Sequence, residues 1–294
     1  MSILANKKTK IICQGILTPQ GLNHTEQALT YGTNIVAGVA SGKGGEKVLD
    51  VPLFNTLNEA VKATKPDMSV IFASPANAVG EIEKAILAKI KWIVCPVERI
   101  PVHDILALQD KLKKSKSHLI GPAAPGIVSA DECKVGTMPA HLFASGNIGI
   151  MSRSSSVMYE AIQQLKDKGV GVSTCVALGA YPVIDTDFIE IFDLFQKDKK
   201  TSIVLLIGEV GGYLEQRFAD YYKKLKRKKP LVSYIVGQFA PAQTYMGNIS
   251  AIVQDETQTA VYKNEKLKQA GSVVVRSPAA IGDTVFKVLT NIGK

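Results

Sequence analysis

The chain has 294 residues, of which 46% are hydrophobic and 21% are charged, and its formal net charge is +9. A chain of this length and composition can bury a substantial core and fits two domains of ordinary size, which excludes wholesale disorder. No apolar run reaches the ~18 residues that a membrane-spanning helix needs.

The start of the chain has no targeting signal that we recognise. Residues 1–10 contain lysines but no apolar signal core after them, and they lack the Arg- and Ser-rich character of an organelle transit peptide. We therefore expect a cytoplasmic protein that does not enter a membrane.

The four cysteines are scattered along the sequence, at Cys13, Cys95, Cys133 and Cys175. None forms a C-x-x-C pair, and no histidine lies at metal-ligand spacing from them. Cys13 and Cys95 lie inside apolar runs, where a thiol acts as a small hydrophobic side chain. Neither a disulfide framework nor a metal site is expected.

Three basic runs occur at residues 111–118, 197–200 and 223–229. A basic surplus favours anionic partners such as nucleic acid, an acidic membrane or a phosphorylated ligand. However, each run lies near the end of a predicted helix, where the helix dipole stabilises cations. No aromatic residues interleave the runs to stack on bases. We interpret them as solvated helix ends, and nucleic acid is disfavoured as a partner.

Apolar strand-like runs alternate with helical patterns along the whole chain. The expected strands are residues 10–14, 34–39, 69–73, 92–96, 118–121, 148–152, 173–178, 202–208, 231–236 and 272–275. The expected helices include residues 57–64, 78–89, 102–114, 155–167 and 213–226. Strands that are apolar throughout belong to parallel sheets covered on both faces, and repeated β-α-β order produces doubly wound α/β domains. The fold class predicted is α/β with two such domains.

A turn-rich stretch, residues 121–126, precedes the predicted boundary between the domains. The segment after it runs through Cys133 to Ser145 and is predicted to make a hairpin-like excursion. We predict an N-terminal domain at 1–126, a connecting hairpin segment at 127–146 and a C-terminal domain at 147–294.

The loops after the first two strands are candidates for phosphate binding. The first strand leads into a loop in which Thr18 suits a helix N-cap and Pro19 suits the first helical position. The second leads to a Gly-rich loop, residues 41–45, that carries Lys43. Amides at a helix N-terminus together with a lysine can hold a phosphate group. The dinucleotide fingerprint G-x-G-x-x-G is absent, so the spacing alone leaves a binding loop and an unliganded loop equally open.

Eight short segments resemble the alpha subunit of succinate–CoA ligase, in the family order and with hardly any gaps. They are residues 12–15 (ICQG), 42–45 (GKGG), 120–122 (IGP), 125–126 (PG), 132–134 (ECK), 152–154 (SRS), 173–176 (STCV) and 207–209 (IGE). The resemblance implies a Rossmann-like coenzyme A (CoA)-binding domain followed by a flavodoxin-like CoA-ligase domain.

The resemblance also implies which residues contact CoA. The matching positions are Leu17, Thr18, Pro19, Gln20, Lys43, Pro96, Val97 and Glu98. The first loop departs from the family, which has T-G-S-Q where this chain has Leu17-Thr18-Pro19-Gln20. Pro19 removes an amide donor, and Thr18 adds a Cβ atom where glycine allows close approach. We expect a CoA pocket that is kept in outline but binds more weakly.

The phosphorylated histidine of the family is missing. The family motif G-H-A-G-A-I corresponds to residues 247–252, in which Asn248 takes the place of the histidine. A neutral imidazole is nucleophilic near pH 7, whereas the amide nitrogen of asparagine has its lone pair delocalised into the carbonyl. The family's basic K-G-K-R approach reads Ala242-Gln243-Thr244-Tyr245, and its Gly-rich continuation contains Asp255 and Glu256. Two acids there oppose a phosphate dianion.

Other positions of the family site are kept. Glu209 matches the glutamate that orients the histidine, and Tyr159 matches a residue beside succinate. Ser154 and Ser155 lie where a helix N-terminus can bind phosphate, although Ser155 replaces the glycine of the family's S-R-S-G-T. Each has a plainer interpretation: Glu209 as a turn cap and Tyr159 as a packing residue. Of the four histidines, His141 alone matches a family histidine near the active site, and a surface role is the simpler interpretation.

The resulting prediction is a degenerate alpha-subunit homologue that keeps the fold, can bind CoA and pairs with a beta-type subunit, but carries no phosphate. One alternative is an active alpha subunit that uses an altered route, such as direct transfer to a bound carboxylate. Another is a binding module that uses the basic surface. The family implies that nucleotide and Mg²⁺ enter only through the ATP-grasp domain of the beta subunit, and this chain has no P-loop.

Overall fold

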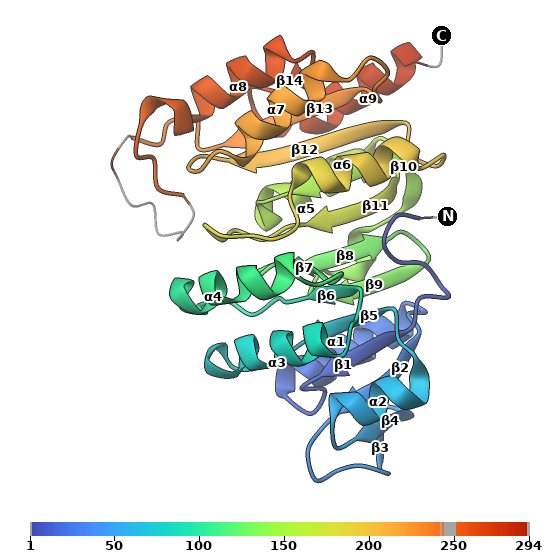
Figure 1. Cartoon of the computed structure of the whole chain (residues 1–294). Helices are drawn as coiled ribbons and strands as arrows, with labels where there is room; N and C mark the ends of the chain where they lie inside the picture. The colour runs from blue at the N-terminus through green and yellow to red at the C-terminus, as the bar shows by residue number, and fades with distance from the viewer. Residues whose placement is uncertain (1, 242, 244–250, 293–294) are drawn as a thin grey trace. The chain divides into compact units, whose positions relative to one another are not determined.

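The computed structural model of the chain describes residues 2–241, 243 and 251–292. These residues form two compact units (Figure 1). The N-terminal unit consists of Leu4–Ala140 with Val183–Thr186, and the C-terminal unit of residues 141–182 and 187–292 with residues 2 and 3. Each contains a predominantly parallel sheet flanked by helices, which confirms the predicted α/β class.

The sheet of the N-terminal unit has the strand order β3-β4-β2-β1-β5-β6-β7. Its strands are β1 (Ile11–Gln14), β2 (Ile35–Val39), β3 (Lys47–Val48), β4 (Val51–Phe54), β5 (Met68–Ile71), β6 (Trp92–Val94) and β7 (His118–Ile120). Apart from β3, which is antiparallel to β4, all pairs are parallel. Numbered by appearance, the parallel strands follow the Rossmann order 3-2-1-4-5-6, with the crevice for ligands at the carboxyl ends beside β1.

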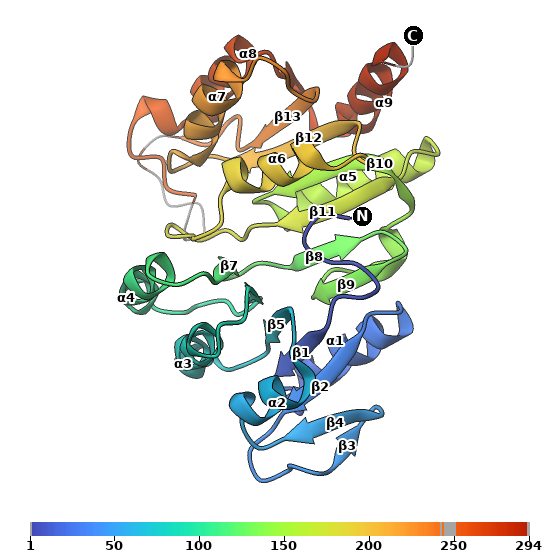
Figure 2. The same ribbon diagram turned by 45° about the vertical axis from the view of Figure 1, so that its right-hand side comes forward.

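Helices cover both faces of this sheet, so β1 is buried at all four positions. They are α1 (Pro19–Thr30), α2 (Leu57–Thr64), α3 (Pro75–Leu87) and α4 (Val102–Lys113). Figure 2 shows α1 on one face and α2, α3 and α4 on the other. The unit also contains β8 (Gly126–Ser129) and β9 (Cys133–Gly136), which pair in antiparallel fashion.

Within the C-terminal unit the strands are parallel and follow the order β14-β13-β12-β10-β11. They are β10 (Ser145–Ser152), β11 (Val172–Ala177), β12 (Ile203–Glu209), β13 (Leu231–Val236) and β14 (Val273–Val274). By appearance this is the flavodoxin-like order 2-1-3-4-5, whose ligand crevice lies between the first and third strands. Here those strands are β10 and β12.

The helices of the C-terminal unit are α5 (Ser155–Asp167), α6 (Phe188–Lys197), α7 (Leu214–Lys224), α8 (Ala260–Gln269) and α9 (Ile281–Ile292). Short 3-10 turns lie at η1 (Ala140–Leu142), η2 (Glu256–Gln258) and η3 (Pro278–Ala280). Helix α5 packs on α9, whereas α7 packs on α6 and α8. Buried rings join α6 to α7, with ring centroids 5.4 Å apart for Phe192–Phe218 and 5.3 Å apart for Phe192–Tyr222.

Every strand predicted from sequence is present, with ends that shift by at most three residues. The hairpin of β3 and β4 is not predicted, because its strands are short and its turn carries no glycine. Instead Leu49 and Asp50 adopt positive φ angles of 51° and 61° in the two-residue turn. The N-cap role of Thr18 and the first helical position of Pro19 are both confirmed.

The interpretations of the basic runs and the cysteines also agree with the structure. Lysines occupy the last turns of α4, α6 and α7. All four cysteines are buried and unbridged. Among the described residues, no helix combines the length and apolar character needed to cross a membrane.

Candidate functional site

The first predicted CoA loop follows β1 and is shaped by Gly15 and Thr18. Gly15 has a φ of +75°, and a Cβ atom there would lie 2.1 Å from the carbonyl oxygen of Phe72. Thr18 Oγ1 accepts the amide of Gly21 at 3.0 Å and donates to the carbonyl of Gly15 at 2.8 Å. Leu17, Pro19 and Gln20 are exposed. The hydroxyl of Thr18 therefore caps α1, and the loop presents its outer residues to solvent.

Lys43 lies in the loop after β2, and this loop is fixed from one side. Asn55 Oδ1 accepts the amide of Gly44 at 2.9 Å, and a Cβ atom on Gly44 would meet the Asn55 side chain. The Lys43 side chain is exposed and forms a 3.1 Å ion pair with Glu46. A surface pair of this kind contributes little stability and exchanges readily for another anion. Lys43 is therefore available to a ligand phosphate.

The third predicted segment, Pro96–Glu98, follows β6. The Val97 side chain is buried at 9% exposure, whereas Glu98 is exposed. The carbonyl of Val97 accepts the amide of Ala123 at 3.0 Å, which ties the segment to the turn after β7. The structure therefore places all three predicted segments after the carboxyl ends of strands in one parallel sheet.

The second candidate site lies at the β10/β12 crevice of the C-terminal unit. β10 ends at Ser152, whose Oγ accepts the amide of Ser154 at 3.0 Å and donates to the carbonyl of Ser154 at 2.8 Å. α5 then starts at Ser155, and its N-cap Ser154 makes no side-chain cap bond. The first amides of a helix have no partner within it, and the helix dipole is positive there. Ser154 and Ser155 thus lie where an anion can be bound.

A buried charge network, Arg153–Glu209–Glu215–Lys263, lies beside this helix start. Arg153 contacts Glu209 at 3.0 Å and Glu215 at 3.1 Å, and Glu215 pairs with Lys263 at 2.5 Å. Lys263 Nζ also donates to the carbonyls of Glu209 and Gly211 at 2.8 and 2.6 Å. The amide of Glu209 donates to Glu215 Oε1 at 3.1 Å. Glu209 is therefore held by both its side chain and its backbone at the end of β12.

The network balances two acids against two cations in a site with almost no solvent. Glu215 and Lys263 are 0% exposed and Arg153 is 4% exposed. Burial raises the pKa of Glu215, but Arg153 and Lys263 outweigh it and hold that pKa below its ordinary value. Burial lowers the pKa of Lys263 even though Glu215 opposes the shift. We infer a charged network, because its hydrogen bonds satisfy both carboxylate oxygens of Glu215.

The remaining predicted residues of this unit are placed as follows. Tyr159 is half-buried on α5, and burial raises its pKa to about 12. His141 is exposed in η1, where its carbonyl accepts Lys166 Nζ at 3.2 Å. Asn248 lies outside the described residues. Within the part of the chain that the structure describes, no group of three acidic, histidine or cysteine side chains could hold a metal ion.

Asp255, which follows Asn248 in the sequence, forms a side-chain hydrogen bond with Tyr213. Tyr213 Oη donates to Asp255 Oδ2 at 2.9 Å, and Asp255 Oδ1 accepts the amide of Thr257 at 2.8 Å. Hydrogen bonds from Thr257 and Tyr213 hold the pKa of Asp255 below its ordinary value. Asp255 is therefore a fixed negative charge at neutral pH.

Two members of the charge network, Glu215 and Lys263, were not found from sequence. Lys263 lies 48 positions after Glu215 on a different helix, and no local pattern links them. The one indication in the sequence is that each is a charged residue on the side of its helix that is otherwise buried.

Two family models match separate parts of the chain. The family model described as "CoA binding domain" matches residues 6–98, and the one described as "CoA-ligase" matches residues 151–273. A "Succinate--CoA ligase [ADP-forming] subunit alpha" of Aquifex aeolicus is 43% identical over 291 residues, which cover 98% of this chain and 95% of that protein. Its counterpart in Staphylococcus aureus is 40% identical over 293 residues, which cover 100% of this chain and 97% of that protein.

Solved structures share the fold at lower identity. ATP citrate lyase from Methanothrix soehngenii, in complex with citrate and coenzyme A, superposes with a TM-score of 0.89 at 24% identity. The match covers 99% of this chain but 52% of that one, so this chain spans about half of that protein. A dinucleotide-forming acetyl-coenzyme A synthetase from Ca. Korarchaeum cryptofilum gives a TM-score of 0.78 at 18% identity. The match covers 94% of this chain and 60% of that one.

Proposed function

Because this chain belongs to the succinate–CoA ligase alpha-subunit family, we propose that it binds coenzyme A and pairs with a beta-type subunit without carrying a phosphoryl group. The proposal depends mainly on Asn248, which stands where the family has its phosphorylated histidine. An amide side chain has no nucleophilic nitrogen with which to form a phosphoramidate.

The CoA part of the proposal rests on the carboxyl edge of the Rossmann-ordered sheet. The residues assigned to CoA are Leu17, Thr18, Pro19, Gln20, Lys43, Pro96, Val97 and Glu98. Thr18 uses its hydroxyl to cap α1, and Pro19 offers no amide, so the start of α1 supplies fewer donors than a serine-containing loop. Lys43 then becomes the principal cation for a CoA phosphate.

The loss of phosphoryl transfer is supported by the surroundings of Asn248 as well. Asp255 is held as an anion close in sequence to that position, and an anion there repels a phosphate dianion. Glu209, Tyr159 and Ser154 match the family, whereas Ser155 stands where the family has a glycine. Glu209 is bound to Arg153 and enclosed by the charge network, so we assign it a structural role in this chain.

Pairing with a beta-type subunit follows from family membership, since the relatives named above are alpha subunits that match along nearly their full length. Such a partner would supply nucleotide and Mg²⁺, for which this chain has no P-loop. We expect the assembled pair to show no acid-labile phosphate on this chain after incubation with ATP.

The Lys43→Ala substitution is expected to weaken CoA binding about fivefold, corresponding to one charge-assisted bond of about 1 kcal/mol. Isothermal titration of CoA into the whole chain measures this change. Lys62→Ala removes another exposed lysine, on α2, and is expected to leave the affinity unchanged. Identical CoA titrations for the parent, Lys43→Ala and Lys62→Ala would remove Lys43 from the proposed site.

A further inference from the structure

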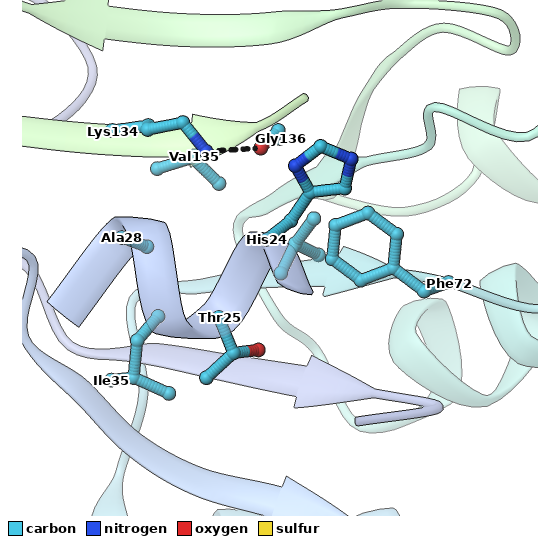
Figure 3. Close-up of a pocket in the computed structure, with 9 residues that line it drawn as sticks. His24, Thr25, Ala28, Ile35, Phe72, Lys134, Val135 and Gly136 are labelled. Atoms are coloured by element: carbon cyan, nitrogen blue, oxygen red, sulfur yellow. Dashed lines mark hydrogen bonds between the residues drawn. The ribbon is translucent and has the colours of Figure 1, made fainter. Parts of the chain in front are cut away.

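A small cavity in the N-terminal unit is lined by residues of α1, β2, β5 and β9, none of which is among the proposed CoA residues (Figure 3). Most of its wall is apolar, from Ala28, Ile35, Val70 and Phe72. Thr25, Val135 and Gly136 also line it, together with two basic side chains, His24 and Lys134. The cavity has a volume of about 10 Å³. The cavity therefore holds one small species.

Lys134 brings a buried ammonium group with spare donors. Its side chain is 0% exposed, and its Nζ donates to the carbonyl of Gly136 at 3.0 Å. An ammonium has three donors, so two are left over. Among the described residues Lys134 forms no ion pair, and burial lowers its pKa to about 8. Burying a cation without a counter-charge is costly, and a bound anion would remove that cost.

His24 presents a second unused polar atom to the same space. Its Nδ1 is buried and has no hydrogen-bond partner within the described part of the chain. The ring stacks on Phe72 with centroids 5.5 Å apart, and Figure 3 shows a ring nitrogen turned toward the Lys134–Gly136 side. Burial, and then the charge of Lys134, lower the pKa of His24, which favours the neutral ring. A side-chain hydrogen bond with Gln27 opposes this shift. When the ring proton is on Nδ1, that atom is a donor.

The hydrogen-bond donors of the cavity indicate whether its ligand is an anion or a cation. The two spare donors of Lys134 and the unpartnered Nδ1 of His24 belong to residues that line one cavity, and the lining includes no carboxylate. A metal cation is therefore disfavoured, and the ammonium group requires an acceptor. Of the lining residues, Lys134 carries the one full positive charge and His24 is neutral, so a monovalent anion matches the charge of the site. We propose that this cavity binds one chloride-sized monovalent anion between Lys134 Nζ and His24 Nδ1.

The position of Phe72 connects this anion site with the neighbouring loop. The carbonyl of Phe72 accepts Thr18 Oγ1 at 3.3 Å and lies under Gly15, while its ring rests on His24. An anion that fixes the His24 ring therefore also fixes the support of the Gly15–Thr18 loop. The site itself stands independently of the proposed CoA function, and its test uses no CoA.

Thermal unfolding of the whole chain at constant ionic strength, with gluconate replaced by chloride or bromide, tests the site. Both halides are expected to raise the Tm by about 3 °C in a saturable manner. The rise is expected to disappear in Lys134→Met and to shrink in His24→Phe, which keeps the ring stack but lacks the donor. Lys62→Met, which changes an exposed lysine of the same unit, is expected to keep the full rise.

Crystals of the parent chain soaked in bromide provide the direct measurement. An anomalous peak between Lys134 Nζ and His24 Nδ1 supports the proposal. A water without anomalous signal at that point would overturn it, and so would an equal halide response in the parent and in Lys134→Met.

Discussion

Replacing Glu215 with glutamine is expected to lower the free energy of unfolding of the C-terminal unit by about 3–5 kcal/mol. The substitution leaves Lys263 and Arg153 buried without the charge that both of them contact. Glutamine keeps one acceptor oxygen but replaces the other with an NH2 group, which cannot accept from Lys263 or Arg153. Urea denaturation followed by far-UV circular dichroism measures the loss.

Asp220→Asn, on the same helix, is the matched control. Its carboxylate pairs with Lys266 at 3.5 Å and is 58% exposed, so its removal is expected to cost less than about 1 kcal/mol. A second check uses Lys263→Met. The double variant with Glu215→Gln is expected to lose less than the sum of the two single variants, because the two side chains are direct partners. Losses of equal size for Glu215→Gln and Asp220→Asn would contradict the account of the network.

The same substitution predicts a pH dependence. The pKa of Glu215 in the folded chain lies below its ordinary value of 4.5, so the unfolded chain binds more protons in this range. The stabilisation from Glu215 is thus complete above about pH 4.5 and is lost as the pH falls through the folded pKa. We expect the stability difference between the parent and Glu215→Gln to narrow below pH 4.5 and to stay constant from pH 5 to 7. A difference that widened on acidification would contradict this.

Gly15→Ala is expected to lower the stability of the N-terminal unit by about 3 kcal/mol and to reduce CoA affinity at least tenfold. The new Cβ would lie 2.1 Å from the Phe72 carbonyl oxygen, which is backbone and cannot rotate away. The loop must move, and with it the start of α1. Chemical denaturation measures the first effect and titration with CoA the second.

Gly32→Ala separates the contact from the backbone conformation. Gly32 also has a positive φ, +90°, but a Cβ atom there meets nothing within 4 Å. It is expected to cost about 1 kcal/mol from the left-handed conformation alone and to leave CoA binding unchanged. If both alanine variants lost the same stability, the close approach of Phe72 would not shape the loop. If Gly15→Ala lost stability but kept its CoA affinity, the close contact with Phe72 would be supported. The assignment of this loop to CoA binding would then be contradicted.

The fold was largely predictable because its signals are local. Runs such as residues 203–207 (IVLLI) are apolar at every position, as a strand covered on both faces requires. Thr18-Pro19 carries a helix start within two residues. The hairpin at β3 and β4 was missed because Leu49 and Asp50 adopt its turn without glycine or asparagine. That turn is imposed by pairing between the strands and by the contact of Gly44 with Asn55.

The sites were predictable in part. The loops after β1 and β2 follow from strand order, since parallel strands bring their carboxyl ends to one edge, whereas the loop after β6 was assigned through the family resemblance. The charge network does not, because Arg153, Glu215 and Lys263 come from three separate elements and meet only in the folded unit. The cavity between His24 and Lys134 likewise joins α1 to β9, and neither residue is preceded by a ligand-binding motif.

Phosphate transfer from ATP labelled in its γ-phosphate tests the central claim most directly. The chain is first assembled with the beta subunit of the Aquifex aeolicus relative, and assembly is verified by gel filtration, so that a blank result reports chemistry rather than a missing partner. The alpha subunit of that relative serves as the labelled control, and Asn248→His shows whether the imidazole alone is lacking. We expect no acid-labile label on the parent chain within the assembled pair. Acid-labile phosphate on any of its histidines, together with formation of succinyl-CoA, would contradict the claim.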